Sequence, residues 1–211
     1  MKKSNLLKDS EYDLRQIVIV LKGNKVKMCG KISSGILLGL IIIVGIAAYL
    51  AWSYAFLSHR AQAINMAWNQ VQIRNKQQMI FIDDLVNAIE SSNSDQLSLD
   101  DIIDAQTTCA MLNLTDDLID NKHDFNEYVQ RYDNLGIELE ELLSNINDDP
   151  NLKLKYRDLT TQLLKNKTEV INAWQNYDNL VITYNKKLGV FPNNIVAPIF
   201  NFPLKNRYHL Q

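Results

Sequence analysis

Residues 32–58 carry no charged side chain, and the apolar core of this segment runs from Ile36 to Leu57. As a helix, this core would be roughly 33 Å long, enough to cross the roughly 30 Å hydrocarbon layer of a bilayer. A cleaved signal peptide is the alternative, but its apolar region is shorter and seldom starts so far into a chain. The pattern therefore predicts a retained transmembrane helix over residues 35–57.

Apolar positions beyond residue 58 recur at helical spacing in three successive stripes. The first covers 64–89, and because neither Gly nor Pro separates it from the span, the two are compatible with one continuous helix. The second covers 125–146 with alternating steps of three and four, and the third covers 152–188. The register of the second stripe extends backwards through Met111, Leu114 and Leu118, which predicts one long second helix.

Short polar or breaking segments separate the stripes. Ser91–Asp95 predicts a break, and Ser98 resembles an N-terminal cap for the next helix. Asp149-Pro150 suits a helix start, while Gly189 and Pro192 suit a helix end. The sequence therefore predicts an all-α fold, with an N-terminal transmembrane helix followed by an antiparallel up-and-down bundle of three to four long helices.

Four segments follow from these boundaries. Residues 1–34 form a basic arm, 35–57 the transmembrane helix, 58–189 the bundle and 190–211 an apolar tail. Three prolines prevent a long helix in the tail, which is too apolar to stay in water, so we expect it to fold back on the bundle. A more specific hypothesis is that the tail contacts a partner or the membrane. The residues that would make this contact are Phe191, Ile195, Ile199, Phe200 and Phe202.

The distribution of basic residues predicts the orientation of the span. Eight Lys and Arg precede it, whereas the first 20 residues after it contain three, Arg60, Arg74 and Lys76. The positive-inside rule then places the arm in the cytoplasm and the bundle on the opposite side of the membrane. Aromatic side chains at the outer end of the span, which favour the headgroup region, are Tyr49, Trp52 and Tyr54.

A stripe of small residues, interrupted by Ile43, recurs at every fourth position of the predicted span. Small side chains on one face let two membrane helices approach closely, so the stripe predicts self-association. The simpler interpretation is that Gly and Ala are common in membrane helices. The residues of the stripe are Gly35, Gly39, Ala47, Ala51 and Ala55.

Composition and charge narrow the function classes. Few Gly and Pro argue against folds rich in strands and turns, and two Cys cannot build a disulfide framework. The net charge of −2 gives no reason to expect nucleic acid as a partner. Residues 83–149 carry a net −16 and residues 150–211 a net +6, which favours packing of the third helix on the second.

No motif for catalysis is evident. Glycine-rich phosphate loops, nucleophile elbows and Cys-x-x-Cys pairs are missing from the sequence. Asp120, His123 and Glu127 would share one helix face, but this is at most half of the ligand set of a metal site in a bundle. We therefore expect no enzyme activity, no metal and no cofactor, and we expect Cys109 to be a small buried apolar residue.

Four segments together resemble the LemA family. Residues 67–89 begin with Ala-Trp, 149–153 read DPNLK, 177–185 read YDNLVITYN, and 191–202 contain FPNNIVA followed by FNF. The resemblance covers roughly residues 60–208 and implies a membrane-anchored antiparallel bundle with no established enzyme activity. Departures from the family pattern include Asn75, Gln77, Gln78, Asp83 and Asn201.

Three functions are compatible with this organisation. The first is a scaffold or interaction module that binds other membrane or envelope proteins and itself. The second is a sensor that transmits a tilt or twist through the span to a cytoplasmic partner of the arm. The third is a role in membrane invagination, as in LemA-like proteins of magnetosome membranes, which also carry a substantial arm before the anchor.

Overall fold

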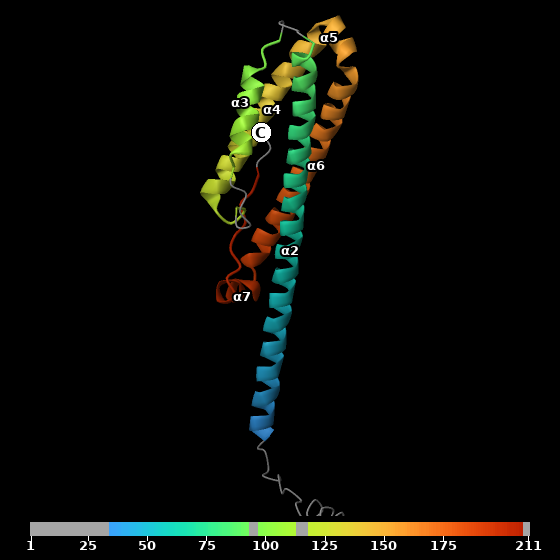
Figure 1. Ribbon diagram of the computed structural model, residues 1–211. Coiled ribbons are helices and arrows are strands. Elements are labelled where there is room, and N and C mark those ends of the chain that lie inside the picture. The colour runs from blue at the N-terminus through green and yellow to red at the C-terminus, as the bar shows by residue number, and fades with distance from the viewer. Residues whose placement is uncertain (1–33, 93–96, 113–117, 209–211) are drawn as a thin grey trace, which may run out of the picture. The chain divides into compact units, whose positions relative to one another are not determined.

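The computed structural model describes residues 34–92, 97–112 and 118–208, and these residues form helices and turns without a strand. Two compact units are distinguished, residues 1–48 and residues 49–211. Figure 1 shows the course of the helices, and the predicted all-α fold is confirmed. The helices are α2 (Ser34–Glu90), α3 (Asp100–Ala110), α4 (Lys122–Asp148), α5 (Pro150–Lys155), α6 (Arg157–Leu188) and α7 (Asn193–Ile199).

Helix α2 is a single helix of 57 residues, which confirms that no break separates the predicted span from the first stripe. Large apolar side chains between Ile36 and Ile46 are exposed on all sides of it, as in a helix that contacts lipid. Within the described residues, α2 alone is long and apolar enough to cross a membrane. Beyond Leu57 the same helix buries one stripe in the bundle, including Ile64 and Val71.

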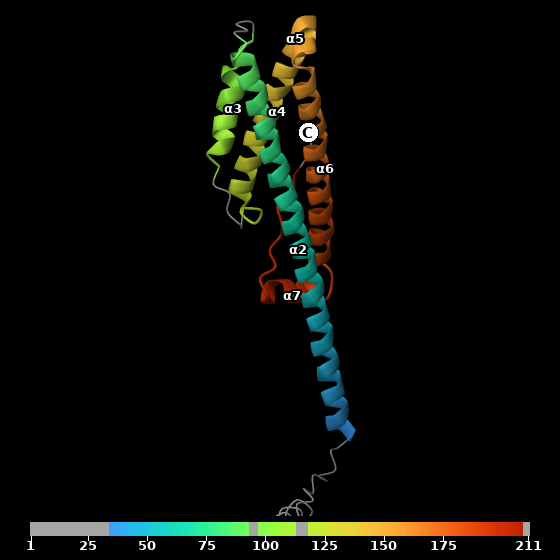
Figure 2. The same cartoon turned by 45° about the vertical axis from the view of Figure 1, so that its right-hand side comes forward.

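The second unit is a bundle of antiparallel helices. Within this unit α2 packs on α4 and on α6, since the ring of Trp68 contacts those of Tyr128 and Trp174. Helix α3 lies against α4 (Figure 2). One end of the core is aromatic and is centred on Trp68, Tyr128 and Trp174. The other end is aliphatic and includes Ile82 and Leu139. The three predicted stripes supply most of these buried positions, because a period near 3.6 places them on one face of each helix.

The prediction of one long second helix is wrong. Met111 is the C-cap of α3 and is 72% exposed, Leu114 lies outside the described residues, and Leu118 is buried but lies in a turn. The side chain of Asn121 starts a new helix by accepting a hydrogen bond from the backbone of His123 at 3.0 Å. The chain instead forms a hairpin in which α3 packs its own apolar face on α4.

Of the other predicted helix ends, those at Asp149 and Gly189 are confirmed and that at Ser98 is not. Asp149 Oδ1 accepts hydrogen bonds from the backbone of Asn151 at 2.7 Å and of Leu152 at 3.3 Å, so Asp149 caps the helix that begins at Pro150. Gly189 is the C-cap of α6, as predicted. Ser98 is not a cap, since α3 begins after Leu99 without a side-chain hydrogen bond.

Candidate functional site

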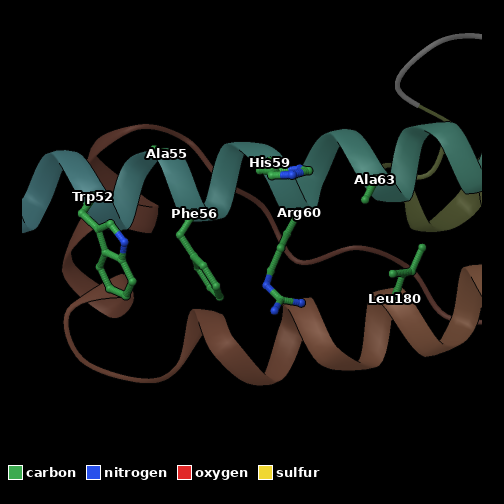
Figure 3. A pocket seen from close by; sticks show the side chains of 7 residues that line it. All are labelled: Trp52, Ala55, Phe56, His59, Arg60, Ala63 and Leu180. Atoms are coloured by element: carbon green, nitrogen blue, oxygen red, sulfur yellow. The ribbon is translucent and has the colours of Figure 1, made fainter.

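A groove lies between α2 and α6 in the second unit, next to the outer end of the predicted span (Figure 3). Its volume is about 510 Å³. Trp52, Phe56 and Arg60 project from α2 towards α6, from which Leu180 supplies the facing wall. Most of the lining is apolar, and the remaining lining residues are Ala55, His59 and Ala63.

Aromatic rings and one guanidinium form a ladder along this face of α2. The ring centroids of Tyr49 and Trp52 are 6.2 Å apart, and those of Trp52 and Phe56 are 5.8 Å apart. The guanidinium carbon of Arg60 lies 4.5 Å from the centroid of the Phe56 ring, a cation–π geometry. Spacings of three and four residues place these side chains above one another on the helix.

The short helix α7 is attached to α2 by a buried polar contact. Ser53 Oγ donates a hydrogen bond of 2.6 Å to Asn193 Oδ1, and both residues are buried. The side-chain nitrogen Nδ2 of Asn193 donates a hydrogen bond of 3.0 Å to the backbone carbonyl oxygen of Lys187, which attaches α7 to the end of α6. Tyr54 adds ring contacts with Phe200 and Phe202, at centroid distances of 4.8 Å and 5.6 Å.

The outward face of α7 remains apolar. Val196 and Ala197 are buried against the bundle, whereas Phe191, Ile195 and Ile199 are 64%, 45% and 65% exposed. Phe200, just after the helix, is 51% exposed, and Phe202 is partly buried. The tail therefore packs on the bundle through one face and presents an exposed apolar face, which consists of Phe191, Ile195, Ile199 and Phe200.

Residues 204–208 form an extended strap along the bundle. The side chain of Asn185 donates to the backbone carbonyl of Lys205 at 2.8 Å and accepts from its amide at 3.0 Å. Tyr177 donates to the carbonyl of Asn206 at 2.8 Å. Lys205, which is 8% exposed, pairs through Nζ with Asp120 at 2.5 Å. These contacts join α6, the strap and the turn before α4.

The predicted small-residue stripe lies entirely on α2. Four of its residues are exposed, and Gly39 is partly exposed. A Cβ added at Gly39 would meet nothing within 4 Å, so this side of the helix is open. Ala55, the last residue of the stripe, also lines the groove between α2 and α6. Whether the stripe joins two copies of the chain stays a prediction.

Two ionisable side chains of the bundle, Cys109 and Tyr184, are kept protonated by burial. Burial raises the pKa of the Cys109 thiol to about 11 and that of Tyr184 to about 12, so both are protonated at neutral pH. Cys109 is 3% exposed, which confirms its predicted burial. Among residues 34–92, 97–112 and 118–208, no three His, Cys, Asp or Glu side chains lie close enough to hold a metal ion.

The fold and this surface define a class: a helical bundle whose first helix continues, towards the N-terminus, into a segment apolar enough to cross a membrane. The sequence profile of the LemA family matches residues 67–211. The chain belongs to the LemA family. A comparison with curated proteins found no match.

The segments that carried the family resemblance have structural roles. Trp68 lies at the centre of the aromatic core, 5.7 Å from Trp174 and 4.9 Å from Tyr128 between ring centroids. Tyr177 and Asn185, at the two ends of a resembling segment, both hold the strap. In this chain the segments 177–185 and 191–202 therefore contribute to the attachment of the tail.

Sequence reasoning missed several residues of this surface. Ser53 has no evident role in the sequence of the apolar span, yet it is fully buried and its hydroxyl bonds to Asn193 of α7. In the sequence Arg60 stands out only as a charge near the predicted span, although it forms part of the groove. Leu180 comes from a distant helix, so only the packing of α6 on α2 reveals its role. A signal for Ser53 exists in hindsight: it is a polar residue between aromatic neighbours.

Proposed function

We propose that this protein is a single-pass membrane-anchored helical scaffold, which binds other membrane or envelope proteins and has no catalytic chemistry. One observation carries the proposal: α2 runs from the exposed apolar segment into the buried bundle seam as a single helix. The bundle is then held at the membrane surface, with the arm in the cytoplasm and the bundle on the opposite side.

The exposed apolar face of α7 supports the interaction role. Apolar side chains that remain exposed beside each other mark surfaces that bind proteins or membranes. This face is held rigidly by Ser53 and Asn193, so it is presented in one orientation. The partners that fit are proteins of the same membrane, since the residues that flank α7, Phe191 and Phe200, contact rings of α2 at the outer end of the predicted span.

Co-purification from membranes tests the scaffold. Ile199→Ser removes an exposed apolar side chain from α7, and Leu154→Ser, at a position 74% exposed on α5, is the matched control. We expect a defined set of envelope proteins to accompany the unmodified chain and the control, and to be lost with Ile199→Ser. If the same envelope proteins co-purify with all three chains, the role of α7 is overturned. If no protein co-purifies with the unmodified chain, the scaffold is overturned.

A sensor is the second candidate, and the continuity of α2 favours it, because an unbroken helix can transmit a tilt or a twist. Deletion of residues 1–30 distinguishes the two functions. A sensor would lose its effect on the cytoplasmic partner and keep its contacts outside the membrane. A scaffold would keep its contacts and its function, because neither depends on the arm. The hypothesis of membrane invagination, as in magnetosome membranes, depends on the long N-terminal arm, which lies outside the described residues, and it stays a prediction.

A further inference from the structure

We propose that the groove between α2 and α6 binds an anionic phospholipid, with its phosphate on Arg60 and an acyl chain against Trp52 and Phe56. The inference rests on the proposed function, because it requires residues 35–57 to cross the bilayer. It goes beyond that function by assigning a ligand to a site that the scaffold itself does not need.

The charge of the groove selects an anion. Arg60 forms no ion pair or hydrogen bond with another described residue, and its guanidinium stacks on the ring of Phe56. No acidic residue lines the groove. A guanidinium presents several donors in a plane that matches the oxygens of a phosphate, and stacking on an aromatic ring leaves these donors free at its edge. The site is therefore suited to a phosphate and repels a cationic ligand.

The apolar wall selects a lipid instead of free phosphate. Trp52 is 61% exposed, although tryptophan is large and mostly buried in soluble proteins. Together with Ala55, Phe56 and Leu180 it lines a volume of about 510 Å³. This volume accommodates a headgroup and the first carbons of one chain, while the rest of the lipid stays in the bilayer. An inorganic anion would leave the apolar wall in contact with water.

The positions along α2 match the layers of a membrane. Arg60 follows Leu57, the last residue of the apolar core, by three positions, or about 4.5 Å along the helix axis. Headgroups extend about 5–7 Å beyond the hydrocarbon layer, so Arg60 reaches the phosphates. Trp52 lies before Leu57 and therefore at the level of the upper acyl carbons. One lipid can contact both residues.

Tryptophan fluorescence provides a selective measurement. The chain has three tryptophans, and Trp68 and Trp174 are only 3% and 4% exposed, so a quencher in the lipid reports on Trp52. The full chain is reconstituted into phosphatidylcholine vesicles that contain equal fractions of brominated phosphatidylcholine or brominated phosphatidylglycerol. Trp52→Phe gives the background signal of the two buried rings.

The unmodified chain should be quenched more strongly by the anionic lipid, with about fivefold enrichment at the site, as expected for one arginine near a membrane surface. Arg60→Gln should abolish this preference, while Arg60→Lys should retain part of it. Arg157→Gln is the control, since the side chain of Arg157 is 71% exposed at the start of α6. Thermal unfolding of each variant verifies that the bundle is intact.

Several results would overturn the proposal. Equal quenching by both lipids in the unmodified chain would show no selectivity for an anion. An unchanged preference in Arg60→Gln would remove the assigned phosphate contact. Quenching by neither lipid, in a chain that floats with the vesicles, would mean that a protein surface covers the groove. A chain that does not float with the vesicles would refute the anchor itself, and the lipid site with it.

Discussion

Ser53 and Asn193, separated by 140 positions in the sequence, are joined by a buried hydrogen bond of 2.6 Å. One residue lies in the predicted membrane span and the other begins the last helix. The bond fixes α7 on α2, and it determines which face of the apolar tail is exposed. The orientation of α7 therefore depends in part on a polar contact that lies among apolar side chains.

Replacement of Ser53 by Ala should destabilise the tail. The amide oxygen of Asn193 would stay buried without a donor, which costs about 1–3 kcal/mol. Hydrogen exchange of residues 193–199 and the midpoint of unfolding measure the effect. Ser144→Ala, at an exposed position on α4, is the matched control and should change neither. Unaltered exchange in Ser53→Ala would show that α7 is held by its other contacts, the ring contacts and the hydrogen bond from Asn193 to Lys187.

Loss of the Asn185 side chain should release the strap. Asn185→Ala removes two hydrogen bonds to the backbone of Lys205, each with a net value of about 1 kcal/mol. Limited proteolysis within residues 204–208 should accelerate, while Asn179→Ala, at an exposed position of α6, should leave the rate unchanged. If both variants are cut at the same rate, the strap is held by other contacts.

The pH dependence of stability should reveal Asp133. Burial raises the pKa of this carboxyl, against the opposing effect of the hydrogen bond from Tyr208. The folded protein therefore binds a proton more readily than the unfolded chain, and this group favours folding more as the pH falls from neutral towards its unfolded pKa, near 4. Asp133→Asn should raise the free energy of unfolding more at pH 7 than at pH 4. An equal change at both pH values would contradict this assignment.

Thiol labelling tests the predicted orientation with the unmodified chain. Cys109 is buried and protonated, so an impermeant maleimide should react only with Cys29, which precedes the span in the sequence. Cys29 should stay unlabelled in intact spheroplasts and react after lysis, and Cys29→Ser should abolish that signal. Labelling of Cys29 before lysis would place the arm outside the cytoplasm.

The small-residue stripe can be tested with a matched pair of glycines. A Cβ at either Gly39 or Gly45 would meet nothing within 4 Å of the same chain, and only Gly39 belongs to the stripe. Gly39→Val should reduce self-association by preventing close approach of two helices, whereas Gly45→Val should not. Energy transfer between labelled chains in vesicles measures this. A similar signal from both variants and the unmodified chain would exclude this face as a contact between copies.

The sequence was sufficient to predict the long stripes, because each apolar face recurs at the helical period over many turns. It could not reveal the hairpin between α3 and α4, since Leu118 fits the same register whether it lies in a helix or is buried from a turn. The sequence could not predict the groove either, because Arg60 and Leu180 are brought to the same groove only by the packing of α2 and α6. The tail residues were singled out as a set, but only the contact with Ser53 distinguishes the buried face from the exposed one.

Site-specific photocrosslinking in intact membranes tests the scaffold most directly. A photoreactive residue at Ile199 lies on the exposed apolar face of α7, and one at Asn134, an exposed position of α4, is the control. We predict discrete crosslinks from Ile199 to a small set of membrane or envelope proteins, identified by mass spectrometry, and none of these from Asn134. Crosslinks to lipid alone, or the same proteins from both positions, would contradict the account of α7 as a surface that binds proteins.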